Sequence, residues 1–103
     1  MFRSPYGSLN EELLGALDRI GNVAIGWNVD SLDWKELGTE VTINNVLGSV
    51  KPGSIILMHD GGNWTMDLSG TVQALDTIIT RLKDDGYEFV TVPQLLNIQE
   101  TKE

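Results

Sequence analysis

The sequence predicts an α/β fold in which three parallel strands alternate with helices. Three apolar runs, at residues 23–27, 54–58 and 87–92, read as strands. The first two are continuous rather than alternating, which is typical of parallel strands covered on both faces. Segments with helical periodicity separate the runs, and this alternation predicts a parallel sheet with helices packed outside it. Three parallel strands do not close a barrel and leave two open edges, so residues 1–103 are expected to form part of a larger α/β sheet or barrel.

The first two helices are predicted from their starting signals. Ser8 and Glu11 have the spacing of a capping box, and Gly21 is a suitable terminator for the helix that follows. A second, shorter helix is expected after Val41, with Thr42 as its cap. The apolar positions expected to face the core are Leu9, Leu13, Ala16, Leu17 and Ile20 in the first helix, and Ile43, Leu47 and Val50 in the second.

The remainder of the chain carries a turn, a long helix and a short final helix. Residues 51–53 read Lys-Pro-Gly, a turn sequence. Ser69 is the expected cap of the longest helix, and Gly86 is expected to close it. Pro93 suits the first turn of a last helix, and residues 97–103 read as a frayed tail. The apolar stripe expected on the long helix is Val72, Leu75, Ile78, Ile79 and Leu82.

The composition limits the function classes. Fifteen acidic residues against seven Lys and Arg give a formal net charge of −8, which argues against binding a nucleic-acid backbone. An acidic surface either attracts a cationic polymer or simply keeps the protein soluble. With no cysteine and a single histidine, the chain has a poor ligand set for zinc, and no metal site is expected from this chain alone.

Candidate catalytic side chains follow the first two predicted strands. Asp30, Asp33 and Trp34 come after the first, and His59 and Asp60 come directly after the second. Because sites gather at the carboxyl ends of parallel strands, Asp33 and His59 are expected to meet at one rim. A carboxylate fixes the tautomer of an imidazole and stabilises its charged form, which makes the pair a proton-transfer device. From spacing alone a structural role for His59 is as open as a catalytic one. Trp34 either walls a small apolar pocket or simply packs in the core, with packing favoured.

Three motifs together resemble the polysaccharide deacetylases, the NodB-homology domain of carbohydrate esterase family 4. Residues 2–7 read FRSPYG, residues 27–34 read WNVDSLDW and residues 56–60 read ILMHD. They are similar to that family's third, fourth and fifth motifs, R-x-P-Y/F-G, D-x-x-D-W and L-x-H. The resemblance implies that residues 1–103 are the carboxyl-terminal half of a distorted (β/α) barrel of the NodB type.

The resemblance also implies a role for each matching residue around the reacting group. His59 would be the general acid that protonates the departing amine when an N-acetyl group is cleaved. Asp33 would pair with His59 and raise its basicity. Trp34 and Leu57 would line the pocket for the acetyl methyl group.

The motifs at residues 2–7 and 27–34 imply three further roles. The Tyr6 backbone N–H would help to hold the oxyanion. Arg3, which alone would read as a solvated charge, would orient the family's catalytic-base aspartate. Asp30 matches its motif and is assigned a supporting role in the structure of the loop.

Two motifs of the family do not occur in this chain. The first, T-F-D-D-G, supplies the base and a metal-binding Asp, and the second, H-S/T-x-x-H, supplies two metal-binding His. The resemblance therefore implies a divalent metal, with zinc favoured, for the complete domain, and predicts neither activity nor zinc binding for the chain alone. It also implies an extracytoplasmic or cell-wall location and a peptidoglycan- or chitin-like substrate.

Two alternatives to the enzyme interpretation stay open. In the first, the chain is a non-catalytic half-domain that acts as an interaction or self-association module. Its exposed strand edges would then pair with another copy of the chain rather than with an amino-terminal half-domain. A carbohydrate-binding remnant would use Trp34 and Trp64.

Overall fold

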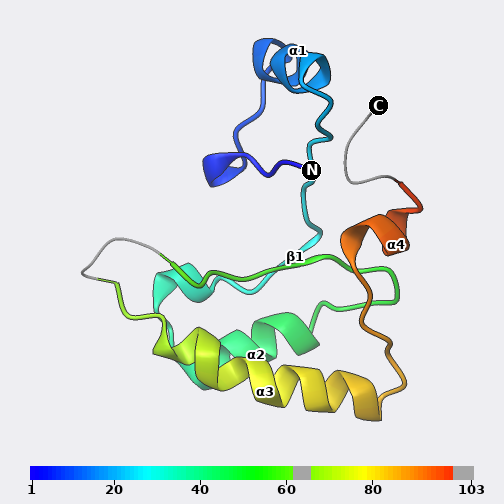
Figure 1. The fold of residues 1–103 in the computed structure, drawn as a ribbon. Coiled ribbons are helices and arrows are strands. Elements are labelled where there is room, and N and C mark those ends of the chain that lie inside the picture. Colours follow the sequence, from blue (N-terminus) through cyan, green and yellow to red (C-terminus); the bar gives the residue numbers. More distant parts are fainter. Residues whose placement is uncertain (62–65, 99–103) are drawn as a thin grey trace. The chain divides into compact units, whose positions relative to one another are not determined.

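The computed structural model describes residues 1–61 and 66–98, which fall into two compact units (Figure 1). One unit comprises Met1–Gly26 together with the segment that begins at Val90, and the other comprises Trp27–Phe89. Trp64 and most of the predicted tail lie outside the described residues.

The unit Trp27–Phe89 is a small α/β layer of two parallel strands on two helices. Its elements are β1 (Val29–Asp30), the 3-10 helix η2 (Asp33–Lys35), α2 (Thr39–Leu47), β2 (Ile56–Leu57) and α3 (Ser69–Asp84). In the sheet Val29 pairs with Ile56 and Asp30 with Leu57. Figure 1 shows α2 and α3 running side by side on one face of the strands.

The core of this unit lies between α2, α3 and the strands. Its buried members are Ile43, Val46, Ala74, Ile78 and Leu82, and the half-buried side chains packed on them include Ile56 and Met58. Each large aliphatic side chain buried in this way contributes about 1.5–3 kcal/mol. The core therefore fixes the two helices against the strands whose carboxyl ends carry the predicted site.

The start of α2 and the buried face of α3 differ from the prediction. α2 begins with Gly38 as its cap, so Thr42 lies inside the helix and its hydroxyl donates to the Gly38 carbonyl at 2.9 Å. α3 starts at Ser69 itself, with Leu68 in the cap position. The predicted stripe on α3 was wrong at Val72 and Leu75, which are 71% and 44% exposed. The buried stripe instead runs Thr71, Ala74, Ile78 and Leu82, because this is the face that α3 turns toward α2 and the strands.

The predicted strand at residues 87–92 is absent from the described structure, in which the sheet has two strands rather than three. Tyr87 instead closes the end of α3 by donating its N–H to the Leu82 carbonyl, and Val92 already belongs to the next helix. A strand needs a neighbour to satisfy its backbone, and no described residue pairs with this segment.

In the unit that begins at Met1, the first predicted strand is shortened to a single β-bridge. Of residues 23–27, only Ala24 makes a bridge, which is parallel to Phe2. α1 spans Glu11–Arg19, and its cap is Asn10, whose side chain accepts from the Leu13 N–H at 2.7 Å. The predicted Ser8 cap was therefore wrong, because Ser8 follows the 3-10 helix η1 (Pro5–Gly7) and its N–H donates to the Pro5 carbonyl.

The glycine and proline signals were more reliable than the caps. Gly21 follows α1 with a φ of 76°, and Gly86 follows α3 with a φ of 90°. Pro93 lies in the first turn of α4 (Val92–Leu96), which has a capping box between Thr91 and Gln94.

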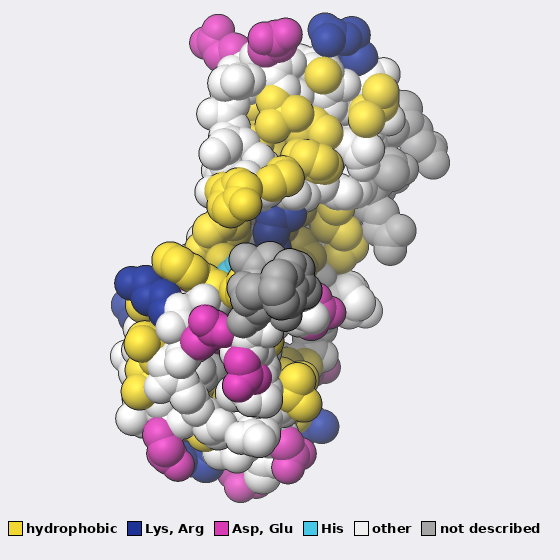
Figure 2. Space-filling model, turned by 90° about the vertical axis from the view of Figure 1, so that its left-hand side faces the viewer, with side chains coloured by type: hydrophobic (Ala, Val, Ile, Leu, Met, Phe, Trp, Pro, Cys, Tyr) yellow, Lys and Arg dark blue, Asp and Glu magenta, His cyan; other side chains and the backbone are white. Residues whose placement is uncertain are grey.

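The acidic side chains are scattered over the face drawn in Figure 2 rather than gathered in one patch. Apolar side chains are interspersed among them in the same view. The exposed residues of α3 include Val72 and Leu75. No helix in the described part of the chain is long and apolar enough to cross a membrane.

Candidate active site

The turn after β1 places Asp33. The Asp30 side chain accepts from the Leu32 N–H at 2.9 Å, and Leu32 takes a left-handed conformation with a φ of 56°. A non-glycine residue in this region costs about 1–2 kcal/mol, and the Asp30 bond helps to hold it there. The chain then enters η2 at Asp33, whose N–H is held by the Ser31 hydroxyl at 3.3 Å. Asp30 thus has the loop-supporting position that its motif predicts.

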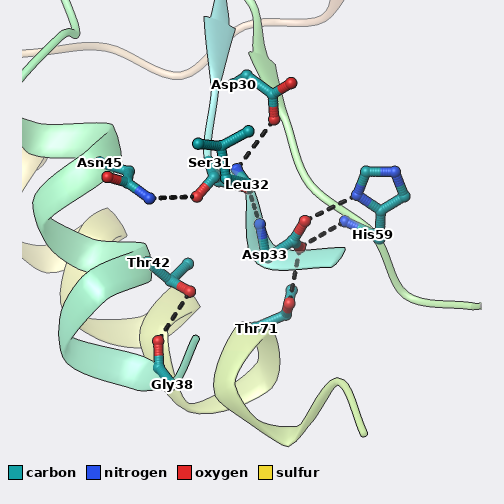
Figure 3. Close-up of polar contacts among 9 residues, drawn as sticks. All are labelled: Asp30, Ser31, Leu32, Asp33, Gly38, Thr42, Asn45, His59 and Thr71. Carbon is teal, nitrogen blue, oxygen red and sulfur yellow. Dashed lines mark hydrogen bonds and ion pairs between the residues drawn. The ribbon is translucent and has the colours of Figure 1, made fainter. Parts of the chain in front are cut away.

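Asp33 and His59 meet at the carboxyl ends of the paired strands (Figure 3). The Asp33 Oδ1 lies 2.7 Å from His59 Nδ1, and its Oδ2 accepts the His59 backbone N–H at 2.7 Å. The side chain of Asp33 is 1% exposed, whereas that of His59 is 34% exposed. One carboxylate therefore holds both the ring and the backbone of the histidine, and the ring remains partly exposed.

The charge state of Asp33 follows from these contacts. Burial by itself raises the pKa of its carboxyl, but hydrogen bonds from the Thr71 hydroxyl and from the amide and imidazole of His59, with the charge of His59, hold that pKa below its ordinary value. An ionised carboxylate only accepts hydrogen bonds, so the proton between the two side chains belongs to His59 Nδ1. His59 Nε2 is then the ring nitrogen left to exchange a proton with a substrate.

Three polar residues at this site were not predicted from the sequence. The buried Thr71 hydroxyl donates to Asp33 Oδ2 at 2.6 Å, and the Asn45 amide of α2 donates to the Ser31 carbonyl at 2.9 Å. Ser31 is fully buried and sits between Asp30 and Asp33 in the motif itself. The signal for Thr71 was its place at the head of the stripe 71, 74, 78, 82, a helical period that the more apolar stripe at 72 and 75 obscured.

The predicted pocket residues lie close to the pair in the chain but differ in exposure. Leu57 is 8% exposed at the end of β2, on the opposite face of the strand from the core residues Ile56 and Met58. Trp34 is 45% exposed in η2, and the Lys35 ammonium lies 5.4 Å from the centre of its ring. Trp34 is therefore not a core residue of this unit.

Arg3 and Tyr6 belong to the unit that begins at Met1. The Arg3 guanidinium donates to the carbonyls of Ile25 and Gly26, at 3.4 and 3.2 Å. Tyr6 has a φ of 58° and a fully exposed side chain, and its backbone N–H has no hydrogen-bond partner among the described residues. A left-handed, non-glycine residue is a strained conformation of the kind found at functional sites.

The described residues include no group of three or more His, Cys, Asp or Glu side chains that could hold a metal ion. His59 has already committed Nδ1 to Asp33. The side chains of residues 1–61 and 66–98 therefore do not fit a metal centre.

Several proteins with similar sequences over about nine-tenths of this chain are named as peptidoglycan-N-acetylglucosamine deacetylases or chitooligosaccharide deacetylases. A peptidoglycan-N-acetylglucosamine deacetylase of Bacillus cereus is 42% identical over 98 residues, which are 93% of this chain and 45% of that protein. A chitooligosaccharide deacetylase of Sinorhizobium fredii is 37% identical, over 89% of this chain and 46% of that protein. The chain is a homologue of the polysaccharide deacetylases. It spans about half the length of these curated relatives, and no protein-family model matches it.

Solved structures with a similar fold include members of carbohydrate esterase family 4. A peptidoglycan N-acetylglucosamine deacetylase bound to a naphthyl-substituted N-hydroxybenzamide superposes with a TM-score of 0.86 at 38% identity, over 97% of this chain and 46% of that one. A family 4 pseudoenzyme of Bacillus anthracis superposes with a TM-score of 0.80 at 35% identity, over 99% of this chain and 33% of that one. The fold of this segment is therefore shared by a protein named as a deacetylase and by a pseudoenzyme.

Proposed function

We propose that this chain supplies the general-acid part of a polysaccharide deacetylase that removes N-acetyl groups from a peptidoglycan- or chitin-like polymer. The observation that carries the proposal is the bond between the ionised Asp33 and His59 Nδ1, which leaves Nε2 of a partly exposed ring as the proton donor. The curated relatives that share this segment deacetylate peptidoglycan N-acetylglucosamine or chitooligosaccharides, as their names state.

The chemistry assigned to the pair is the second half of amide hydrolysis. In the tetrahedral intermediate the C–N bond must break, and an amine leaves poorly unless it is protonated. Imidazolium His59 gives its Nε2 proton to that nitrogen, the C–N bond breaks to give acetic acid and the free amine, and the ring becomes neutral while its Nδ1–H still donates to the Asp33 carboxylate. Asp33 favours the step by stabilising the imidazolium that must exist before it.

The remaining roles of the site are proposed from the motif match. Leu57 and Trp34 would contact the acetyl methyl group, which suits the apolar side chain of the first and the exposed ring of the second. The Tyr6 N–H would donate to the oxyanion, which its lack of a partner among the described residues permits. Arg3 would orient a base aspartate, with part of its guanidinium already used on carbonyls.

The complete site requires residues that are not in this sequence. We assign the base and the divalent metal, with zinc favoured by the family, to a complementary segment carrying the D-D and H-x-x-x-H motifs, and the two together would complete the distorted barrel. The metal would activate the attacking water, which His59 and Asp33 do not do. This chain would be inactive without that segment. We also propose an extracytoplasmic site of action, which is supported by the peptidoglycan substrate in the names of some relatives.

Complementation tests the proposal. The chain is mixed with a segment bearing the missing motifs, zinc is added, and acetate release from N-acetylglucosamine oligomers is measured. We expect release from the mixture, none from either part alone, and about 10²–10⁴-fold slower release when His59 is replaced. No release from a complex shown to have formed would contradict the enzymatic function.

The pseudoenzyme neighbour supports a second candidate, a non-catalytic interaction module. In the described sheet each strand has one neighbour, so each also has an unpaired edge. A defined dimer in sedimentation, formed without the complementary segment, would favour this function, whereas a monomer would count against self-association through the edges.

A further inference from the structure

We infer that Thr71 is a positioning residue of the Asp33–His59 pair, whose hydroxyl fixes the carboxylate so that the imidazole presents Nε2 outward. The inference deepens the proposed function and depends on it for its catalytic meaning. None of the three motifs contains Thr71, which comes from the first turn of α3.

The carboxylate of Asp33 is held from two sides (Figure 3). Two of its described donors, the backbone N–H and Nδ1 of His59, come from one residue and therefore move together. The third donor is the Thr71 hydroxyl of α3, which lies 2.6 Å from Oδ2, and α3 packs against α2 in the core. Thr71 thus ties the orientation of the carboxylate to the rigid core, and the carboxylate in turn orients the ring.

Burial makes this hydroxyl difficult to replace. The Asp33 side chain is 1% exposed and Thr71 is 7% exposed, so water has little access to Oδ2. A buried ionised carboxylate depends on its donors for stability. Removing one leaves a charge with fewer hydrogen bonds, free to rotate away from the imidazole.

Comparison with Thr42 shows that the bond from Thr71 to Asp33 is not the usual bond of a helical threonine. Both threonines are buried and lie in the first turn of neighbouring helices. Thr42 donates to the carbonyl of Gly38, four residues earlier, which is the usual local alternative for a helical threonine. Thr71 donates to a side chain 38 residues away instead.

The test compares Thr71→Val and Thr71→Ser with Thr42→Val as the matched control. Titration of the chain by NMR follows the Asp33 carboxyl and the two ring nitrogens of His59. We expect Thr71→Val to raise the pKa of Asp33 above that of the wild type and to reduce the fraction of neutral imidazole with its proton on Nδ1. Thr71→Ser and Thr42→Val should both match the wild type. Glu36 and Asp67, which line the same pocket as Asp33 and Thr71, are unchanged in every variant.

The complemented enzyme gives a second readout. Loss of a hydrogen bond to a charged group should lower kcat about tenfold with KM unchanged in Thr71→Val, and Thr71→Ser should restore it. If Thr71→Val does not fold, Thr71→Cys, with a weaker donor of similar size, must still raise the pKa of Asp33 relative to Thr71→Ser.

The outcomes separate this inference from the proposed function. An unchanged Asp33 titration in Thr71→Val, or an equal shift in Thr42→Val, overturns the role of Thr71 even if the complemented wild type releases acetate. The expected titrations without acetate release from the wild-type complex leave the positioning role intact and overturn the proposed function.

Discussion

Asp33→Asn is the substitution that probes the centre of the site. The amide keeps the size of the carboxylate but has one oxygen and one NH₂ group where three donors now converge on two oxygens. With its oxygen at the Oδ2 position, the amide retains Thr71 and the His59 N–H, but its NH₂ then faces His59 Nδ1. The imidazole must move its proton to Nε2 to avoid two opposed donors.

The energetic effect comes from replacing charged by neutral hydrogen bonds. A bond to a charged group contributes about 1.5–3 kcal/mol and a neutral one about 1 kcal/mol. Three such replacements are partly offset because a neutral amide costs less to bury, and the bond to the partly exposed His59 is discounted for solvent. We expect Asp33→Asn to lower the free energy of unfolding by about 1–2 kcal/mol at pH 7.

The pH dependence gives the sign of the same effect. Because the pKa of Asp33 is lower in the folded chain than its ordinary value of 3.8, its ionisation stabilises the fold at pH values above 3.8. This contribution is lost as the pH falls through the folded pKa. The difference between wild type and Asp33→Asn should therefore be largest near neutral pH and shrink below pH 3.8.

Urea unfolding at several pH values, with ¹⁵N shifts of the His59 ring, measures both effects. Asp30→Asn is the matched control, because the Asp30 side chain accepts one backbone N–H that an amide oxygen accepts equally well. The reasoning is refuted if Asp33→Asn unfolds like the wild type at pH 7, or if its neutral imidazole keeps the proton on Nδ1.

Three other substitutions test the proton donor and its support. His59→Gln should reduce acetate release by the complemented enzyme by about 10²–10⁴-fold while leaving its zinc content unchanged; a smaller loss would remove His59 as the general acid. Gly70→Ala should destabilise the chain by about 1 kcal/mol in urea unfolding, because the added Cβ would lie 3.2 Å from the Gly38 carbonyl carbon. Its control Gly15→Ala, also in a helix but near only the tip of Arg19, should be neutral or stabilising, and a reversed order would contradict the close packing of α2 on α3. Asn45→Ala should cost about 1 kcal/mol by releasing the Ser31 carbonyl, and an unchanged unfolding midpoint would show that this bond contributes nothing.

The sequence was sufficient to predict the meeting of Asp33 and His59, because a general rule of parallel sheets brings the carboxyl ends of neighbouring strands together. The observed register, with Asp30 opposite Leu57, places the two loops next to each other as that rule requires. Glycine and proline were similarly informative, since their backbone preferences are intrinsic to the residue. Gly21, Gly86 and Pro93 all act where they were expected to act.

The extent of the strands could not be predicted, because an apolar run fixes the burial of a segment but not its pairing partner. Residues 23–27 and 87–92 have the composition of buried strands, yet the described chain offers a single bridge at Ala24 to the first and no partner to the second. The caps failed for a related reason. Ser8, Thr42 and Ser69 all suit a helix start, but the observed caps lie one to four residues away from them.

The case of Thr71 shows why the support of a site is harder to predict than its reactive groups. Asp33 and His59 are fixed in space by strand topology, which a sequence pattern indicates. Thr71 reaches Asp33 only through the rotation of α3 about its axis. The predicted and observed stripes share Ile78 and Leu82, and their centres lie about 60° apart around the helix. Packing chose the stripe with fewer large apolar residues, leaving Val72 on the surface and burying a hydroxyl. That choice is favourable because the buried carboxylate needs the donor: the requirement of Asp33 and the packing of Ala74, Ile78 and Leu82 select the same rotation.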